Sequence, residues 1–78
     1  METVYQCYNM DYDSLADKLR EEGINELYIN EMTFGGNRSG EWYAVRGSEK
    51  FCFHITKRIF EDKPPLFSLV IEKEDDDD

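Results

Sequence analysis

The sequence predicts a single small α+β domain, in which one helix packs on one face of a four- to five-stranded, mixed and mostly antiparallel sheet. One stretch has the apolar spacing of a helix, and several others are rich in β-branched and aromatic residues, as strands are. At 78 residues the chain has the length of one domain. We place that domain at residues 1–73 and an acidic tail at residues 74–78.

The helix is predicted at residues 11–23. Its apolar side chains recur at i, i+3, i+4 and i+7 and form one stripe, made of Tyr12, Leu15, Ala16 and Leu19. Asp11 or Asp13 is suited to cap the N-terminus, and Gly23 is suited to the position just after the C-terminus. The stripe predicts that this helix packs on the sheet through one side only.

Five other stretches predict strands, at residues 3–9, 24–34, 41–46, 51–56 and 66–72. In the second of them the apolar phase changes near Asn30, which predicts a β-bulge or a break. A loop at residues 35–40 and a tight turn at residues 47–50 separate the later strands. Residues 57–65 either extend the preceding strand or form a short helical turn that the two prolines end.

The predicted order is therefore β-α-β-β-β-β. Short links on either side of the helix predict a right-handed crossover, which would make the first two strands parallel. The later strands are expected to follow as antiparallel hairpins. One helix covers only one face, so we expect the other face to expose aromatic side chains and to serve a partner or a homodimer.

The net charge of −9 is unevenly distributed. Residues 1–34 hold eight acidic and two basic side chains, a net charge of −6, and residues 74–78 contribute −5. Residues 35–73 hold five acidic and seven basic side chains, a net charge of +2. An argument from acidity must therefore depend on where the acidic residues lie.

Catalysis and metal binding have one candidate pair. Cys52 and His54 are two residues apart in a predicted strand, so they share a face and form a possible nucleophile and base. No third residue has an orienting spacing, and adding Cys7 gives only three zinc ligands without CxxC or HxxxH spacing. We therefore predict packing roles, two reduced thiols, no enzymatic activity, no metal and no cofactor.

Membrane insertion and secretion are not predicted. No apolar run is long enough to cross a bilayer, and the N-terminal stretch lacks the basic and apolar regions of a signal peptide. We expect a cytoplasmic protein, in the host cytoplasm if a phage encodes it.

The acidic residues carry the strongest functional signal. Asp13, Asp17 and Glu21 recur at i, i+4 and i+8, which places them on one exposed line about 6 Å apart. Glu22, Glu26 and Glu31 extend the acidic region beyond the helix. This spacing resembles that of phosphates along nucleic acid, so we predict a partner protein with a basic nucleic-acid-binding surface. Trp42 and Tyr43 are predicted to add the non-polar part of the contact.

In size, charge and absence of a catalytic motif, the chain resembles the small anti-CRISPR and anti-restriction inhibitors of phages and plasmids and other DNA mimics. No residue motif accompanies this general likeness. It implies a binding protein that inhibits a nucleic-acid-handling complex by occupying its DNA- or RNA-binding surface. One alternative is a protein–protein adaptor or small dimeric domain whose acidity only serves solubility.

A second alternative is a binder of single-stranded nucleic acid. Six basic residues of the second half lie near Trp42 and Tyr43 in the sequence: Arg38, Arg46, Lys50, Lys57, Arg58 and Lys63. Basic and aromatic side chains on one sheet face bind single strands in several folds. The overall negative charge argues against this alternative.

Overall fold

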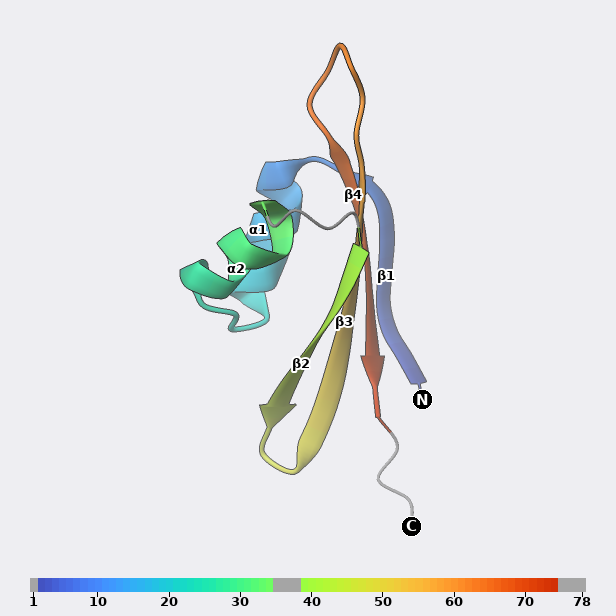
Figure 1. Ribbon diagram of the computed structural model, residues 1–78. Helices are drawn as coiled ribbons and strands as arrows, with labels where there is room; N and C mark the ends of the chain where they lie inside the picture. The colour runs from blue at the N-terminus through green and yellow to red at the C-terminus, as the bar shows by residue number, and fades with distance from the viewer. Residues whose placement is uncertain (1, 35–38, 75–78) are drawn as a thin grey trace.

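The computed structural model describes residues 2–34 and 39–74, which form four strands and two helices (Figure 1). The elements follow the order β1 (Glu2–Met10), α1 (Tyr12–Glu21), α2 (Glu26–Phe34), β2 (Ser39–Arg46), β3 (Glu49–Arg58) and β4 (Leu66–Lys73). The α+β class is confirmed. The acidic tail beyond Glu74 and most of the predicted loop at residues 35–40 lie outside the described residues.

The sheet is antiparallel throughout, in the order β1-β4-β3-β2. The predicted mixed sheet with parallel first strands is wrong, because β1 pairs with β4 and not with the next strand along the chain. Two helices separate β1 from β2 and carry the chain to the opposite edge of the sheet. The last strand then fills the gap between β1 and β3, so β1 and β2 are both edge strands.

Helix α1 forms as predicted. Leu15, Ala16 and Leu19 are fully buried, and the Asp11 side chain caps the N-terminus by accepting a 2.8 Å hydrogen bond from the backbone N–H of Ser14. At the other end Gly23 has φ of +86°, a conformation that favours glycine. The backbone N–H of Ile24 bonds to the Leu19 carbonyl at 3.0 Å, and the chain turns away in a Schellman motif.

Residues 26–34 form a second helix, and the strand predicted at residues 24–34 is wrong. The apparent change of apolar phase is helical spacing, since Ile29, Met32 and Thr33 are buried at i, i+3 and i+4. Asn25 caps the helix by accepting a 2.9 Å hydrogen bond from the Leu27 N–H. The exposed apolar residues on the other side of α2 obscured this pattern in the sequence.

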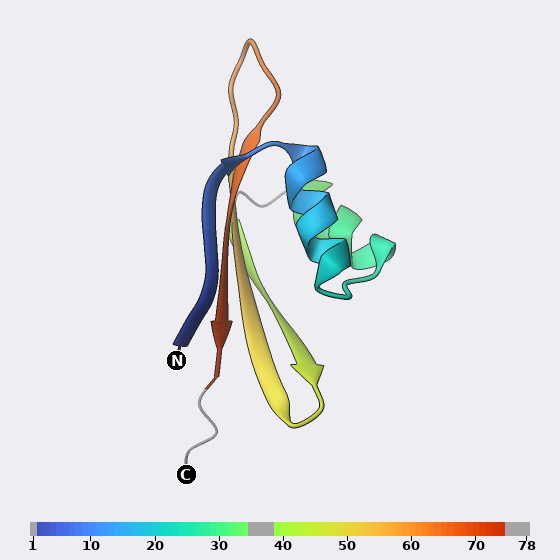
Figure 2. The same ribbon diagram turned by 180° about the vertical axis from the view of Figure 1, so that it is seen from behind.

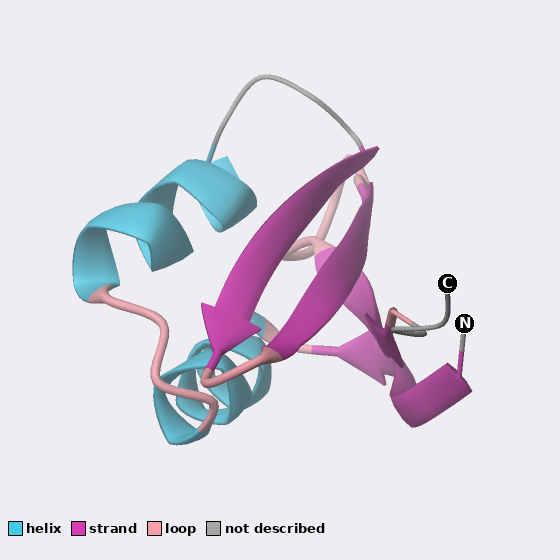
Figure 3. Ribbon diagram, turned by 90° about the horizontal axis from the view of Figure 1, so that it is seen from below, coloured by secondary structure: helices cyan, strands magenta, loops and turns pink. Residues whose placement is uncertain are grey.

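Both helices lie on the same side of the sheet, so one sheet face is covered and the other is open (Figures 2 and 3). The core lies between the helices and the covered face. Its fully buried members include Leu15 and Leu19 from α1, Ile29 from α2, and Phe53 and Leu69 from the sheet. No helix in the described part of the chain is long and apolar enough to cross a membrane.

The hairpin connections set the register of the sheet. Strands β2 and β3 are joined by two residues, Gly47 and Ser48, because Arg46 pairs with Glu49. This turn is shorter than the predicted one at residues 47–50. The β3–β4 connection is a longer loop that projects past one end of the sheet, drawn in orange at the top of Figure 1.

Candidate functional site

The predicted acidic line lies on the solvent side of α1. The Asp17 and Glu21 side chains are 77% and 71% exposed, and Asp13 is also exposed. Arg20 pairs with Asp17 at 2.9 Å, and Lys18 lies 3.6 Å from Glu21. Asp13 has no ion pair among the residues that the structure describes. The line is thus available to solvent but partly neutralised by its own helix.

Two of the remaining predicted acidic residues form ion pairs within the protein. Glu22 is only 19% exposed and is held by Lys18 at 2.9 Å and by Arg46 at 2.8 Å. Arg46 also donates to the Glu22 backbone carbonyl, so the contact between these two residues joins the end of α1 to β2. Glu26 accepts two hydrogen bonds from Arg20, at 2.6 and 3.0 Å. Glu31 lies exposed on α2.

The ion pairs change the acidity of these groups. Burial raises the pKa of the Glu22 carboxyl, but hydrogen bonds from Lys18 and Arg46 outweigh it and hold the pKa below its usual value. The hydrogen bonds from Arg20 lower the pKa of Glu26. Both groups therefore remain ionised to lower pH than free carboxyl groups.

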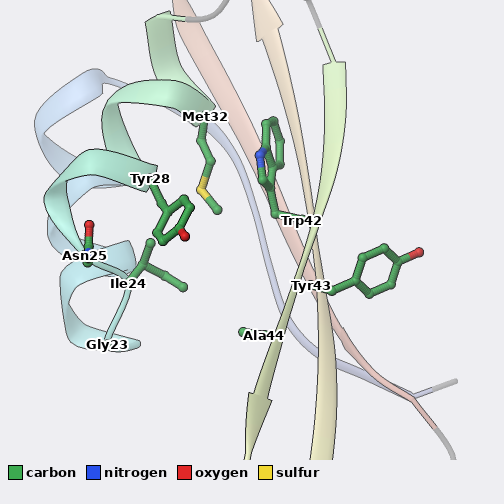
Figure 4. Close-up of a pocket in the computed structure, with 8 residues that line it drawn as sticks. All are labelled: Gly23, Ile24, Asn25, Tyr28, Met32, Trp42, Tyr43 and Ala44. Carbon is green, nitrogen blue, oxygen red and sulfur yellow. The ribbon is translucent and has the colours of Figure 1, made fainter.

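Trp42 and Tyr43 do not form one aromatic surface. Successive residues of a strand point to opposite faces, so Trp42 projects toward the helices and Tyr43 projects away from them (Figure 4). The prediction that the open face exposes aromatic side chains is met in part, since Tyr43 is 57% exposed there. Trp42 belongs to the covered side, where it packs against the core.

An apolar groove lies between α2 and the edge strand β2 (Figure 4). Its volume is about 470 Å³, and side chains that line it include Ile24, Tyr28, Met32, Trp42 and Ala44. On the same helix, the Leu27 side chain is 72% exposed. This groove was not predicted from the sequence, because residues 24–34 were expected to form a strand.

The Trp42 ring lies across the backbone of Gly40 in the same strand. A Cβ atom at Gly40 would collide with the indole ring, so only glycine leaves the ring in this position. The absence of a side chain at Gly40 therefore lets the Trp42 ring line one wall of the groove.

The open face of the sheet holds a cluster of polar side chains around His54. Its Nε2 atom lies 2.7 Å from Glu72 Oε1, and its Nδ1 atom lies 3.6 Å from Glu41 Oε2. Cys52 donates to the same Glu41 oxygen at 3.8 Å. Cys52 and His54 thus share a face, as the sequence predicted, and the carboxylates come from the two neighbouring strands. The sequence analysis missed Glu41 and Glu72.

The surroundings of Cys52 raise the pKa of its thiol. Burial is the largest cause, the carboxylates of Glu41 and Glu72 raise the pKa further, and only the hydrogen bond with Tyr43 opposes them. Activated catalytic thiols have the opposite shift.

The two cysteines are free and lie on opposite faces of the sheet. Cys7 pairs across the strands with Leu69 on the covered side, whereas Cys52 pairs with Tyr43 on the open side. Cys52 is buried and Cys7 is half-buried. The sheet itself therefore keeps the two thiols apart.

The basic residues of the second half do not gather into one patch within the described chain. Arg46 and Lys57 turn toward the helices, where Lys57 donates to the Thr33 carbonyl at 3.0 Å. Lys50 pairs with Glu74 at 3.5 Å on the other side. Arg58 and Lys63 flank Phe60 in the projecting loop, and Arg38 lies outside the described residues.

Comparison of the chain with protein-family models, with curated proteins and with solved structures finds no match.

Proposed function

We propose that the protein is a small acidic binding protein that inhibits a nucleic-acid-handling complex by occupying its basic DNA- or RNA-binding surface. The proposed mode of inhibition is that of the phage-encoded anti-CRISPR and anti-restriction proteins that mimic DNA. Such inhibition is stoichiometric and needs no cofactor.

The exposed line of Asp13, Asp17 and Glu21 carries this proposal. The three acidic residues are held on a helix that is capped at both ends and anchored in the core, so their backbone positions are about 6 Å apart along the helix axis. Because this backbone is already ordered, binding to a groove of Lys and Arg side chains costs less conformational entropy than the ordering of a flexible segment would. Their opposite charge speeds association and orients the partner.

The helical layer as a whole is acidic. Residues 11–34 hold seven acidic and two basic side chains, a net charge of −5. Glu31 and the exposed Leu27 lie on α2 within the same layer, so apolar contacts are available next to the charges. We propose that this layer, and not the open sheet face, meets the target.

The decisive experiment compares two charge reversals of equal size. Asp17→Lys with Glu21→Lys changes the acidic line, and Glu61→Lys with Asp62→Lys makes the same change in the projecting β3–β4 loop, where both residues are exposed. Each variant is used as bait against nuclease and nucleic-acid-binding complexes, and captured complexes are released with double-stranded DNA. We expect the first variant to lose capture at least tenfold and the loop variant to keep it.

Two further measurements belong to this experiment. Wild-type capture should fall steeply between low and moderate salt, because the contact is electrostatic. Thermal unfolding of both variants shows whether the fold is kept. Equal capture by the wild-type chain and the helix variant, or capture that added DNA does not release, would rule out mimicry.

The apolar groove supports a second candidate, the protein–protein adaptor. Its walls combine Tyr28 and Met32 from α2 with Trp42 from the edge strand β2, and Leu27 is exposed on the same helix. The variant Leu27→Ser with Tyr28→Ser separates the two functions. An adaptor loses its partner in this variant at any salt concentration, whereas a mimic loses it mainly through the charge reversal.

A further inference from the structure

Four side chains with metal-binding or metal-supporting chemistry meet on the open face, on three adjacent strands. Glu41 of β2 lies directly opposite His54 of β3, and Cys52 of β3 lies directly opposite Glu72 of β4. Cys52 and His54 are two residues apart, so they point the same way. The register of the sheet, and not a local motif, brings the four together.

His54 lies between two carboxylates that come from the neighbouring strands. Its Nε2 atom lies 2.7 Å from Glu72 Oε1, and its Nδ1 atom lies 3.6 Å from Glu41 Oε2. The Nδ1 atom and the Glu41 carboxylate therefore face each other across a gap that a metal ion bound to both atoms would fill.

The distances fit a tetrahedral metal ion. Zinc bonds of about 2.0–2.3 Å place neighbouring ligand atoms about 3.3–3.7 Å apart. Glu41 Oε2 lies 3.6 Å from His54 Nδ1 and 3.8 Å from Cys52 Sγ. All three ligand atoms lie within 4.8 Å of one another, so small side-chain rotations close the site.

The donor set selects the type of metal. A thiolate and an imidazole with one carboxylate favour zinc and similar transition metals over magnesium or calcium, which prefer oxygen. The contact with Glu72 is the carboxylate–histidine arrangement that orients metal-binding imidazoles. Three protein ligands leave a fourth position, and His54 and Glu41 are 34% and 57% exposed, so this position faces solvent.

We propose that Glu41, Cys52 and His54 bind one Zn²⁺ ion on the open face of the sheet, with Glu72 as the positioning residue for His54. This site goes beyond the proposed inhibitory function, because the acidic line lies on the other side of the molecule. It also replaces the expectation of a metal-free protein. That expectation considered Cys7 as the third ligand, and Cys7 lies on the covered face.

The test uses the full reduced chain, freed of metal with a chelator, and Co²⁺ as a spectroscopic substitute for Zn²⁺. We expect a thiolate-to-cobalt charge-transfer band that saturates at one equivalent and is displaced by Zn²⁺. Cys52→Ser and His54→Gln should abolish this band, and Cys7→Ser, on the opposite face, should leave it unchanged. Circular dichroism checks that each variant is folded.

Glu72→Gln tests the positioning role separately. We expect the band to keep its energy while the affinity falls about 10- to 100-fold, since the ligands are intact but the imidazole is less well oriented. Absence of the band in the wild-type chain would overturn the site. Cobalt binding without a thiolate band would also overturn it, because acidic side chains elsewhere would then hold the ion.

Discussion

The two faces of the sheet are built from alternating residues of the same strands, yet they differ in burial and in polarity. On the covered face, Phe53 and Leu69 are fully buried against both helices. On the open face, Glu41, His54 and Glu72 form a polar cluster at intermediate or full exposure. Stability therefore depends on one face, which leaves the other free to carry charged and metal-binding groups.

The largest expected effect comes from removing a core side chain on the covered face. Phe53→Ala leaves a cavity at the centre of the only core in the described chain. It should lower the free energy of unfolding by about 3–5 kcal/mol, which is most of the stability of a domain of this size. Thr56→Ala changes an exposed open-face residue in the same strand and should cost under about 0.5 kcal/mol. Urea unfolding of both variants measures the difference, and similar costs would contradict the division between the faces.

The next effect concerns the edge of the covered face. Gly40→Ala forces the Trp42 ring out of its position, which should cost about 1–3 kcal/mol and shift the tryptophan fluorescence to the red. The matched control is Ser39→Ala, which alters the neighbouring exposed residue on the open face. An unchanged emission spectrum in Gly40→Ala would mean that the ring does not lie across residue 40.

A smaller effect follows from the contact that joins α1 to β2. The pKa of Glu22 lies below its usual 4.5 in the folded protein, so its contribution to stability is complete above that pH and is lost as the pH falls through the folded pKa. Glu22→Gln should reduce stability by about 0.5–1 kcal/mol at neutral pH, since the pair is partly exposed, and flatten the acid dependence. Thermal unfolding between about pH 3 and 7 measures this slope.

The control for this slope is Glu21→Gln, on the same helix turn but 71% exposed. We expect this variant to unfold with the acid dependence of the wild-type chain. An equal flattening in both variants would assign the slope to the general charge of α1 instead of the Glu22 contact.

The smallest effect is expected for the acidic tail. Removal of residues 74–78 deletes five acidic side chains and no apolar side chain, so the fold should be kept and the unfolding free energy should stay within about 0.5 kcal/mol of the wild-type value. Target binding should weaken only modestly and chiefly at low salt, because charges are screened beyond about 8 Å at physiological ionic strength. Loss of inhibition on deletion, with the Asp17 and Glu21 reversal harmless, would make the tail the active element.

The sequence predicts an element correctly where its apolar periodicity and its capping residues agree. Helix α1 has a complete apolar stripe with Asp11 and Gly23 at its ends, and four of the five predicted strands are present. It failed for α2, because the exposed Leu27 and Tyr28 mask a stripe of only a few buried residues. The pairing of β1 with β4 is a contact between the two ends of the chain, and no local pattern reports it.

The register of the β2–β3 hairpin determines which residues of the open-face cluster could be predicted from the sequence. The predicted turn at residues 47–50 would place Glu41 opposite Thr56, but the observed two-residue turn places it opposite His54. Gly47, with φ of +62°, followed by Ser48 is a signal for the shorter turn. With that reading, the sequence alone would have placed Glu41 beside Cys52 and His54.

The separation of the two thiols has a practical consequence for locating any partner. Cys7 lies in a surface hollow shared with Asp17 and Glu21, whereas Cys52 lies beside Glu41 and His54 on the opposite face. Cys7 is half-buried and Cys52 is buried, so alkylation followed by mass spectrometry labels Cys7 in the folded chain and Cys52 mainly when the sheet opens. A ligand that slows the labelling of Cys7 alone covers the helical side, and one that slows the labelling of Cys52 alone stabilises the sheet, and neither test needs a substitution in the chain.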